Sequence, residues 1–161
     1  MTDFENSSFM CKGDSLYTNY ASAIGTAVGL SSIGGKTGIA TDGSRAAKSA
    51  AYSIMGALSA ASSRVWNFGE SFYAQFQYLV KFCSLDSGIF ISRKNAQTVI
   101  RICGKNGLPI SINAQNELES IMNNSKFLED KPASFGEISE MHGVGMMYLR
   151  QLLRQARGEL K

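Results

Sequence analysis

Small and apolar residues recur at helical spacing through most of this chain, and this pattern constrains its fold more than any other feature. The alanine-rich segment Ser44–Ser63 is the strongest helix candidate, because alanine has the highest helix propensity. Glu70–Cys83 and Ala114–Met122 are two further candidates with the same period. We therefore predict a mainly α-helical protein, with at most two short strands near Ile89–Ile91 and Pro109–Ile112.

The segment Ser15–Gly35 is uncharged and rich in small residues. Ala21, Gly25 and Gly29 recur at every fourth position, so one face of a helix would be nearly bare of side chains. Such a face gains stability only when another helix approaches closely. Polar residues dilute the apolar content below that of a membrane-spanning helix. We therefore interpret the segment as a soluble helix packed against a partner helix.

The most basic segment follows a short apolar run. Ser92 is positioned to cap a helix over Arg93–Gly104, which places Arg93 and Lys94 in its first turn. Positive charge in the first turn opposes the helix dipole, so helix stability does not explain why Arg93 and Lys94 occupy these positions. One explanation for the two residues is contact with phosphate, and the other is that they belong to a solvated surface.

The chain has 161 residues, enough for one domain with a substantial core. Residues 1–14 are polar and lack periodicity, and we predict a disordered tail there. Residues 15–86 form a helical part with small residues and aromatics, and residues 88–161 form a more charged helical part. Gly88 is the expected joint between them, within a single helical domain.

The composition limits the classes of function. A net charge of +3 is too small to indicate a nucleic-acid-binding protein by itself. Three widely spaced cysteines favour a reducing compartment, and one histidine without a Cys-x-x-Cys pair argues against a zinc site. Gly34–Thr37 lacks the first glycine of a phosphate loop at the required distance, so it belongs to a linker. We expect no cofactor or metal and a cytoplasmic location, or alternatively export without a cleaved signal or a place in a virion.

No set of residues in the sequence forms a recognisable catalytic motif. His142 is interpreted as a turn or packing residue, because a general base needs a nucleophile or substrate group within reach. The carboxylates are scattered without the spacing of metal ligands. We therefore expect a protein that is not an enzyme.

The stretch Ser134–Gly158 has the pattern of two short helices joined by a tight turn. Ser134 and Glu137 form an S-x-x-E capping box at the start of the first helix. Gly143 is the structural turn residue, because glycine turns sharply without steric cost. A second helix follows, with apolar residues at helical spacing. These residues are Val144, Tyr148, Leu149, Leu152 and Leu153.

This pair of helices resembles the helix-turn-helix of bacterial transcription regulators, and within that class the first helix-turn-helix of AraC-type activators. The shared residues are Gly143, Val144, Tyr148, Leu149, Arg150, Leu152, Arg154, Ala156 and Gly158. The resemblance implies a DNA-binding transcriptional regulator of bacterial or phage origin.

The resemblance also implies which residues contact DNA. The helix Gly145–Arg157 would lie in the major groove with its N-terminal half at the base edges. Arginine can then pair with guanine or phosphate, and glutamine with adenine. The expected contacts are Met146, Met147, Arg150, Gln151 and Arg154, with Arg93 and Lys94 as further phosphate contacts. A lone unit of this kind must dimerise, so we expect a homo-oligomer that binds double-stranded DNA.

Two alternatives remain open at the level of sequence. In the first, the helical pair is only a packing motif, and Met146 and Met147 belong to an adaptable protein-binding surface. Ala21, Gly25 and Gly29 would then assemble with copies of the chain, or with a secretion-system or virion structure. In the second, Gly143–Gly145 forms the hairpin of a helix-hairpin-helix that binds the DNA backbone.

Overall fold

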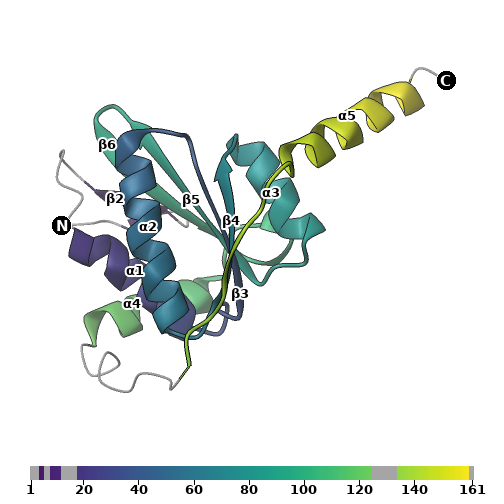
Figure 1. Cartoon of the computed structure of the whole chain (residues 1–161). Coiled ribbons are helices and arrows are strands. Elements are labelled where there is room, and N and C mark those ends of the chain that lie inside the picture. The colour runs from purple at the N-terminus through teal and green to yellow at the C-terminus, as the bar shows by residue number, and fades with distance from the viewer. Residues whose placement is uncertain (1–3, 6–7, 12–17, 125–133, 160–161) are drawn as a thin grey trace.

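The computed structural model describes residues 4–5, 8–11, 18–124 and 134–159, and one mixed β-sheet runs through its centre (Figure 1). Its seven strands are β1 (Phe4–Glu5), β2 (Ser8–Cys11), β3 (Lys36–Thr41), β4 (Arg64–Glu70), β5 (Ser87–Lys94), β6 (Gln97–Cys103) and β7 (Ile138–Glu140). They lie in the order β1-β2-β6-β5-β3-β4-β7. Strands β5, β3, β4 and β7 are parallel to one another, whereas β6, β2 and β1 run antiparallel to their neighbours.

Helices cover both faces of this sheet (Figure 1). Helices α1 (Thr18–Leu30), α2 (Arg45–Ala60) and α4 (Ile112–Asn123) pack together on one face. Helix α3 (Tyr73–Phe82) lies on the other, in contact with the short 3-10 helix η1 (Lys105–Gly107) and with α5 (Gly145–Glu159). The architecture is therefore a three-layer α/β/α arrangement, and the prediction of a mainly α-helical protein is wrong.

The predicted strand near Ile89–Ile91 lies within β5, but the other interior strands do not follow from the sequence pattern. After Lys36, every residue of β3 is buried, and β6 is buried at five of its seven positions. A strand covered on both faces has no alternation of apolar and polar residues, which is the usual signal of a strand. For this reason β3 was interpreted as a linker, and β6 as part of a helix over Arg93–Gly104.

The strands of this one sheet come from all three parts into which the sequence analysis divides the chain. Strands β1 and β2 lie within residues 1–14, where a disordered tail is predicted; β1 pairs with β2, and β2 pairs with β6. Residues 1–3, 6–7 and 12–14 of that segment lie outside the described residues. Gly88, the expected joint, lies within β5, and residues 15–86 and 88–161 both contribute strands to the one sheet.

The small-residue face of α1 packs against α2. A Cβ atom added at Gly25 would lie 2.7 Å from the carbonyl oxygen of Ile54, and one added at Gly29 would lie 2.6 Å from the Cβ of Ala61. Ala21 is fully buried. The prediction that this face lies against another helix is confirmed. Because that helix belongs to the same chain, the alternative use of this face for a protein partner is wrong.

Each face of the sheet carries its own apolar core. The core under α1, α2 and α4 includes Ile24, Ile54, Leu58, Ile89 and Leu118. The core under α3 includes Phe68, Phe76, Leu79, Leu85 and Phe90. None of the helices that the structure describes has the length and apolar content needed to cross a bilayer.

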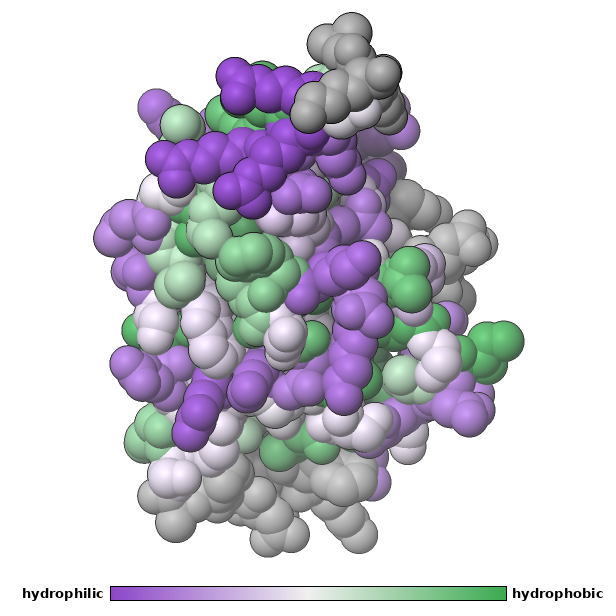
Figure 2. Space-filling model, turned by 90° about the vertical axis from the view of Figure 1, so that its right-hand side faces the viewer, coloured by the Kyte–Doolittle hydropathy of each residue, from purple (hydrophilic) through white to green (hydrophobic). Residues whose placement is uncertain are grey.

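The C-terminal stretch does not form a helix-turn-helix. Residues Ile138–Glu140, expected in the first helix of the pair, form β7, which pairs with β4. Gly143 has a φ of 73° and lies between this strand and α5. Leu149 and Leu152 are 51% and 42% exposed, because no first helix exists for them to pack against. Helix α5 extends away from the rest of the molecule (Figure 1), and Figure 2 shows hydrophobic and hydrophilic residues interspersed on that side.

Candidate functional site

The parallel strands β3, β4 and β5 all end at one edge of the sheet. From β3 the chain continues into α2 on one face, and from the neighbouring strand β4 it continues into α3 on the other face (Figure 1). Loops that leave adjacent strands toward opposite faces open a crevice between them, and ligands of such sheets bind there. The carboxyl ends of β3 and β4 are therefore the candidate site.

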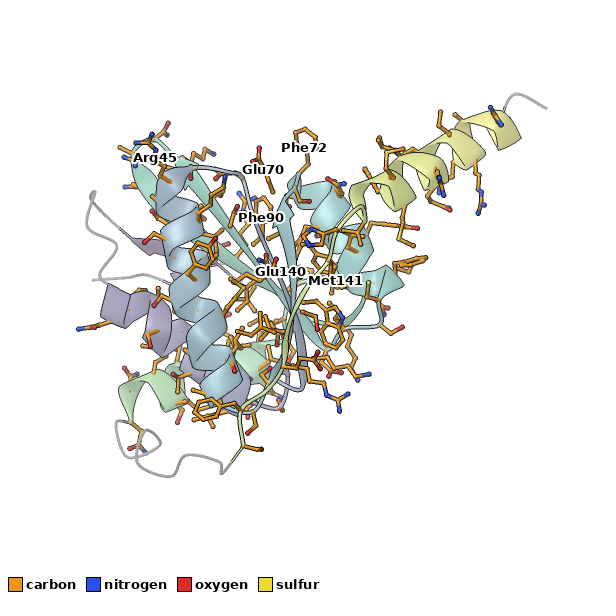
Figure 3. The ribbon with its side chains drawn as sticks, viewed as in Figure 1. Arg45, Glu70, Phe72, Phe90, Glu140 and Met141 are labelled. Atoms are coloured by element: carbon orange, nitrogen blue, oxygen red, sulfur yellow. The ribbon has the colours of Figure 1, made fainter. Side chains whose placement is uncertain are left out.

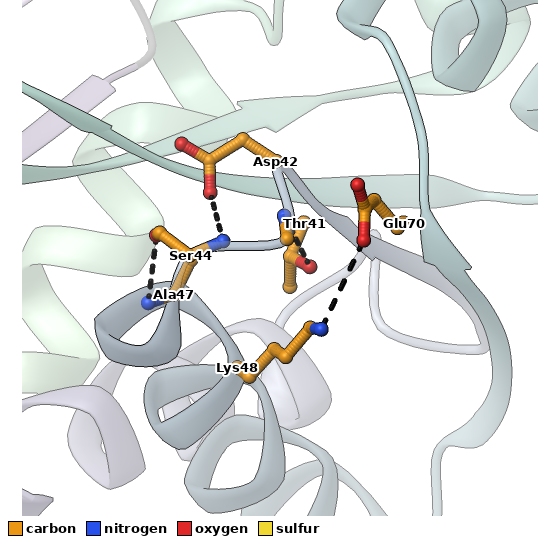
Figure 4. A network of polar contacts seen from close by, with 7 residues as sticks. Thr41, Asp42, Ser44, Ala47, Lys48 and Glu70 are labelled. Carbon is orange, nitrogen blue, oxygen red and sulfur yellow. Dashed lines mark hydrogen bonds and ion pairs between the residues drawn. The ribbon is translucent and has the colours of Figure 1, made fainter.

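The loop that joins β3 to α2 is held by its own side chains (Figure 4). The Oγ1 of Thr41 accepts the N–H of Gly43 at 3.2 Å, and the Oδ1 of Asp42 accepts the N–H of Ser44 at 2.9 Å. The Oδ2 of Asp42 accepts the N–H of Arg93 at 2.7 Å. Burial raises the pKa of Asp42, but the N–H donors outweigh it, and the net effect lowers the pKa below its usual value. The ionised carboxylate thus ties the end of β5 to the start of α2.

Cationic residues lie in the first turns of α2 and at the end of the neighbouring strand β5. Ser44 caps this helix by accepting a backbone N–H at 3.4 Å, and the first turn contains no acidic residue. Arg45 begins the helix and Lys48 follows one turn later, while Arg93 and Lys94 end β5 beside the same loop. Figure 3 shows Arg45 and Glu70 at this end of the molecule. A helix N-terminus attracts anions, and the four cations add to this field, so the site suits a phosphate group.

A hollow of about 280 Å³ lies beside these cations, between α2 and the carboxyl ends of β4 and β7. Helix α2 contributes Lys48, Tyr52 and Met55 to its wall, and the sheet contributes Asn67, Glu70 and Glu140. The Nζ of Lys48 lies 3.8 Å from an oxygen of Glu70. The Nδ2 of Asn67 donates to both carboxylate oxygens of Glu140, at 3.0 and 2.9 Å. Closely spaced hydrogen-bonding groups beside an aromatic ring suit a polyhydroxylated ligand.

Replacing Asp42 by asparagine is expected to lower the free energy of unfolding by about 1 kcal/mol at pH 7, since an amide nitrogen cannot accept the second N–H and the site is exposed. A carboxyl group with a lowered pKa in the folded protein stabilises it above the unfolded pKa, and this contribution is lost as the pH falls through the folded pKa. The two proteins should therefore converge below the ordinary value of 3.8. Urea unfolding at pH 7 and pH 3 checks this, and an equal difference at both values would contradict it.

The two thiols whose side chains the structure describes do not line this hollow. Burial raises the pKa of Cys103 to about 12, and it also raises the pKa of Cys83. Both are free cysteines and pack with the core under α3. Within the described residues, no group of three or more histidine, cysteine, aspartate or glutamate side chains is placed to hold a metal ion.

The structure separates the residues that the sequence grouped for DNA contact. Arg93 and Lys94 end β5 at the hairpin to β6, where a helical first turn was expected. Met146 and Met147 open α5 and are 56% and 37% exposed. Arg150, Gln151 and Arg154 follow on α5, and none of these five α5 residues lines the hollow.

Sequence reasoning missed the polar residues that lie at and just after the ends of β3, β4 and β7. Asp42, Gly43 and Ser44 directly precede an alanine-rich helix, which is the signature of a turn followed by an N-cap. That signal marks a ligand site only when the preceding segment is known to be a strand. Glu70 and Glu140 lie at the ends of β4 and β7, two strands that were not predicted.

A three-layer α/β/α domain with a polar crevice at the carboxyl ends of parallel strands defines the class of open-sheet α/β ligand-binding domains. Residues 12–129 match the family model described as phosphoglucomutase/phosphomannomutase, alpha/beta/alpha domain I. The match covers most of the chain, and the chain therefore belongs to the phosphoglucomutase/phosphomannomutase family. Strand β7 and helix α5 lie beyond the matched residues.

Solved structures give the same fold. A phosphoglucomutase/phosphomannomutase family protein from Burkholderia thailandensis superposes with a TM-score of 0.68 over 85% of this chain, at 17% identity. A protein assigned as a phosphomannomutase from Thermus thermophilus has a TM-score of 0.67 over 87% of this chain, at 16% identity. The chain spans 32% and 33% of the length of these two proteins. No curated protein is similar enough in sequence to match this chain.

These findings correct the functional predictions from sequence. The resemblance to AraC-type regulators is wrong, because the family match and the fold both identify a different class. The predictions of a DNA-binding regulator, of a double-stranded DNA partner and of a non-enzymatic assembly protein are therefore wrong as well. The expectation of a protein that is not an enzyme is also contradicted, since the family carries the names of two enzymes.

Proposed function

We propose that this chain is the first α/β/α domain of a phosphohexomutase-type enzyme, and that its crevice binds a phosphorylated hexose. The names of the family denote enzymes that act on phosphorylated glucose and mannose. One observation carries the proposal for this chain: a capped helix start with nearby cations adjoins a hollow lined by hydrogen-bonding groups. Such a ligand has one strongly anionic group and one neutral, hydroxyl-rich ring, and the site has a region for each.

The phosphate is assigned to the start of α2. Asp42 lies there too, but its two oxygens already accept backbone N–H groups, so its negative charge is partly compensated. Glu70 shares the charge of Lys48 in an exposed ion pair of 3.8 Å. Exposed pairs of this kind contribute little, about 0–1 kcal/mol, so a doubly charged phosphate can displace Glu70 from Lys48.

The assignment of the phosphate group and the sugar ring to separate regions of the site fits the chemistry of phosphoryl transfer. In that reaction the protein contributes chiefly by positioning the phosphoryl group and by stabilising its charge. Arg45, Lys48, Arg93 and Lys94 supply charge, and the cap of α2 supplies aligned backbone dipoles. We assign these residues to binding and orientation of the phosphorylated hexose, and the transfer itself to the enzyme of which this domain is part.

Replacing Lys48 by alanine is expected to weaken the binding of glucose 1-phosphate or mannose 1-phosphate roughly tenfold, because one charge-assisted contact is lost. Isothermal titration calorimetry or NMR titration of the chain measures this. Lys105→Ala is the matched control, since Lys105 forms a similar ion pair of 3.7 Å with Asp86 at the opposite edge of the sheet. The control should bind like the unmodified chain. Equal losses in both variants, or equal affinity for glucose and glucose 1-phosphate, would contradict the proposal.

We also propose a cytoplasmic location. The thiols of Cys83 and Cys103 are both free, which is the usual state in a reducing compartment.

A further inference from the structure

Helix α5 carries an apolar stripe that none of the described residues covers. Met146, Leu149, Leu153 and Ala156 recur at alternating intervals of three and four residues, which places them along one side of the helix. We call these four residues the α5 stripe. The side chains of Met146, Leu149 and Leu153 are 56%, 51% and 59% exposed. Their spacing is that of a helix seam that packs against another surface.

The α5 stripe is distinct from the side of the helix that faces α3. Tyr148 and Leu152 line a hollow of about 480 Å³ together with residues of α3. The ring centroids of Tyr148 and Tyr78 lie 5.5 Å apart across it. None of the four residues of the stripe lines this hollow. Because α5 extends away from the rest of the molecule (Figure 1), the stripe is open to a partner.

A row of arginines borders the α5 stripe. Arg150, Arg154 and Arg157 recur at i, i+4 and i+7 on the helix, next to the stripe, and all three are exposed. Among the described residues, no carboxylate pairs with them. In an antiparallel pair of two α5 helices the same flank of each helix meets, so the two arginine rows would repel each other. The complementary surface is therefore apolar and bordered by carboxylates, and it is not a second copy of α5.

We propose that the α5 stripe is the docking surface for a second structural unit of the enzyme, which presents an apolar surface bordered by carboxylates. This inference rests on the proposed function, because it takes the chain as one domain of a larger enzyme. Helix α5 lies beyond residues 12–129, which match domain I, and the chain spans 32% and 33% of the length of two solved relatives. Burial of the large apolar side chains of the stripe supplies the driving force, and the arginine row sets the orientation.

Two synthetic helical peptides probe the chemistry of the α5 stripe. Both carry leucine at the a and d positions of a heptad, and the flanking e and g positions are glutamate in one peptide and lysine in the other. The chain should bind the glutamate peptide, and the affinity should fall with added salt, because exposed charges are screened. The lysine peptide should not bind. Fluorescence anisotropy of the labelled peptides measures both affinities. Equal binding of both peptides, or binding of neither, overturns the inference.

Two leucine variants locate the binding surface. Leu149→Asp should weaken the binding of the glutamate peptide at least about tenfold, since a charge replaces a central apolar contact. Leu108→Asp is the matched control, because Leu108 is 61% exposed and lies between η1 and α4. It should bind the peptide like the unmodified chain. Thermal unfolding should show that Leu149→Asp keeps the fold, and a large loss of stability would place the stripe inside the molecule and overturn the inference.

A charge reversal tests the arginine row. Arg154→Glu should weaken the binding of the glutamate peptide and strengthen that of the lysine peptide, because the sign of one bordering charge is inverted. Arg64→Glu is the control, since Arg64 is exposed at the start of β4. It should leave both affinities unchanged. Equal effects of the two substitutions would show that only the net charge of the chain matters, which contradicts a specific docking surface.

Sedimentation equilibrium of the chain alone examines the other occupant. A dimer that Leu149→Asp dissociates would assign the stripe to a second copy of the chain and overturn the inference.

The outcomes also distinguish this inference from the proposed function. Leu149→Asp should bind glucose 1-phosphate like the unmodified chain, because Leu149 does not line the hollow beside Lys48. If glucose 1-phosphate binds in a manner that depends on Lys48 and neither peptide binds, the proposed function holds and the docking surface is wrong. If the glutamate peptide binds and glucose 1-phosphate does not, the proposed function is overturned, and the assignment of the partner to that enzyme is overturned with it.

Discussion

Replacing Phe76 by alanine is expected to lower the free energy of unfolding by about 4 kcal/mol, because the large cavity left behind cannot close. Phe76 is fully buried in α3, and its ring centroid lies 6.2 Å from that of Phe68 and 5.7 Å from that of Phe90. These contacts join α3 to β4 and β5, the strands that precede and follow it in the chain. Urea unfolding monitored by circular dichroism measures the loss.

Phe82 in the same helix supplies the control. Its side chain is 52% exposed, so Phe82→Ala should cost less than about 1 kcal/mol. Comparable losses in the two variants would show that the core under α3 is not packed as described.

Replacing Gly25 by leucine is expected to lower the free energy of unfolding by about 3 kcal/mol, because overpacking forces α1 and α2 apart. Even a Cβ atom at Gly25 would lie 2.7 Å from the backbone oxygen of Ile54 and 2.9 Å from the Cβ of Ala57. A backbone carbonyl within a helix cannot move aside as the end of a flexible side chain can. The midpoint and slope of a urea titration give the change in stability.

Gly56 in α2 is the matched position, since nothing lies within 4 Å of a Cβ added there. Leucine at Gly56 should raise the free energy of unfolding by several tenths of a kcal/mol, up to about 1 kcal/mol, through its higher helix propensity. The two glycine-to-leucine changes should thus have opposite signs. A stabilising effect of Gly25→Leu would disprove the close contact between α1 and α2.

The helices with strong local signals were predictable. Ser44 and the alanines after it mark α2 at Arg45–Ala60, close to the predicted Ser44–Ser63. Helix α4 at Ile112–Asn123 contains the predicted helix Ala114–Met122. Its cap is Ser111, whose oxygen accepts the N–H of Ala114 at 3.2 Å. A cap and a helical period lie within a few neighbouring residues, so one sequence suffices to detect them.

The sheet was not predictable in the same way. Gln97–Cys103 places Val99, Ile100 and Cys103 at a spacing that also fits a helix, and only tertiary pairing with β5 and β2 decides for a strand. Lys36–Thr41 contains glycine, alanine and threonine and has the composition of a loop, yet it is the interior strand β3, which pairs with both β4 and β5. Its small residues are accommodated because both faces are covered by helices.

The candidate site depended on that missing sheet. The sequence pattern predicts Arg93 and Lys94 in the first turn of a helix, with phosphate contact or a solvated surface as the explanation, and it gives no relation between them and Asp42. The hydrogen bond from the N–H of Arg93 to the carboxylate of Asp42 joins the ends of β5 and β3, and no local pattern reveals such a contact. Asn67 and Glu140 are separated by a still longer stretch of chain.

Strand β7 has a consequence for the solubility of the chain. It pairs with the outer side of β4, through Val65, Trp66 and Asn67, and a Cβ atom at Gly136 just before it would collide with the carbonyl oxygen of Ser63. Without these three residues of β7, β4 would present a row of unpaired N–H and C=O groups together with its apolar side chains. Exposed sheet edges of this kind recruit strands from other molecules. This short strand therefore protects the edge of β4 from pairing with other molecules. Loss of its pairing with β4 is expected to cause precipitation of the chain.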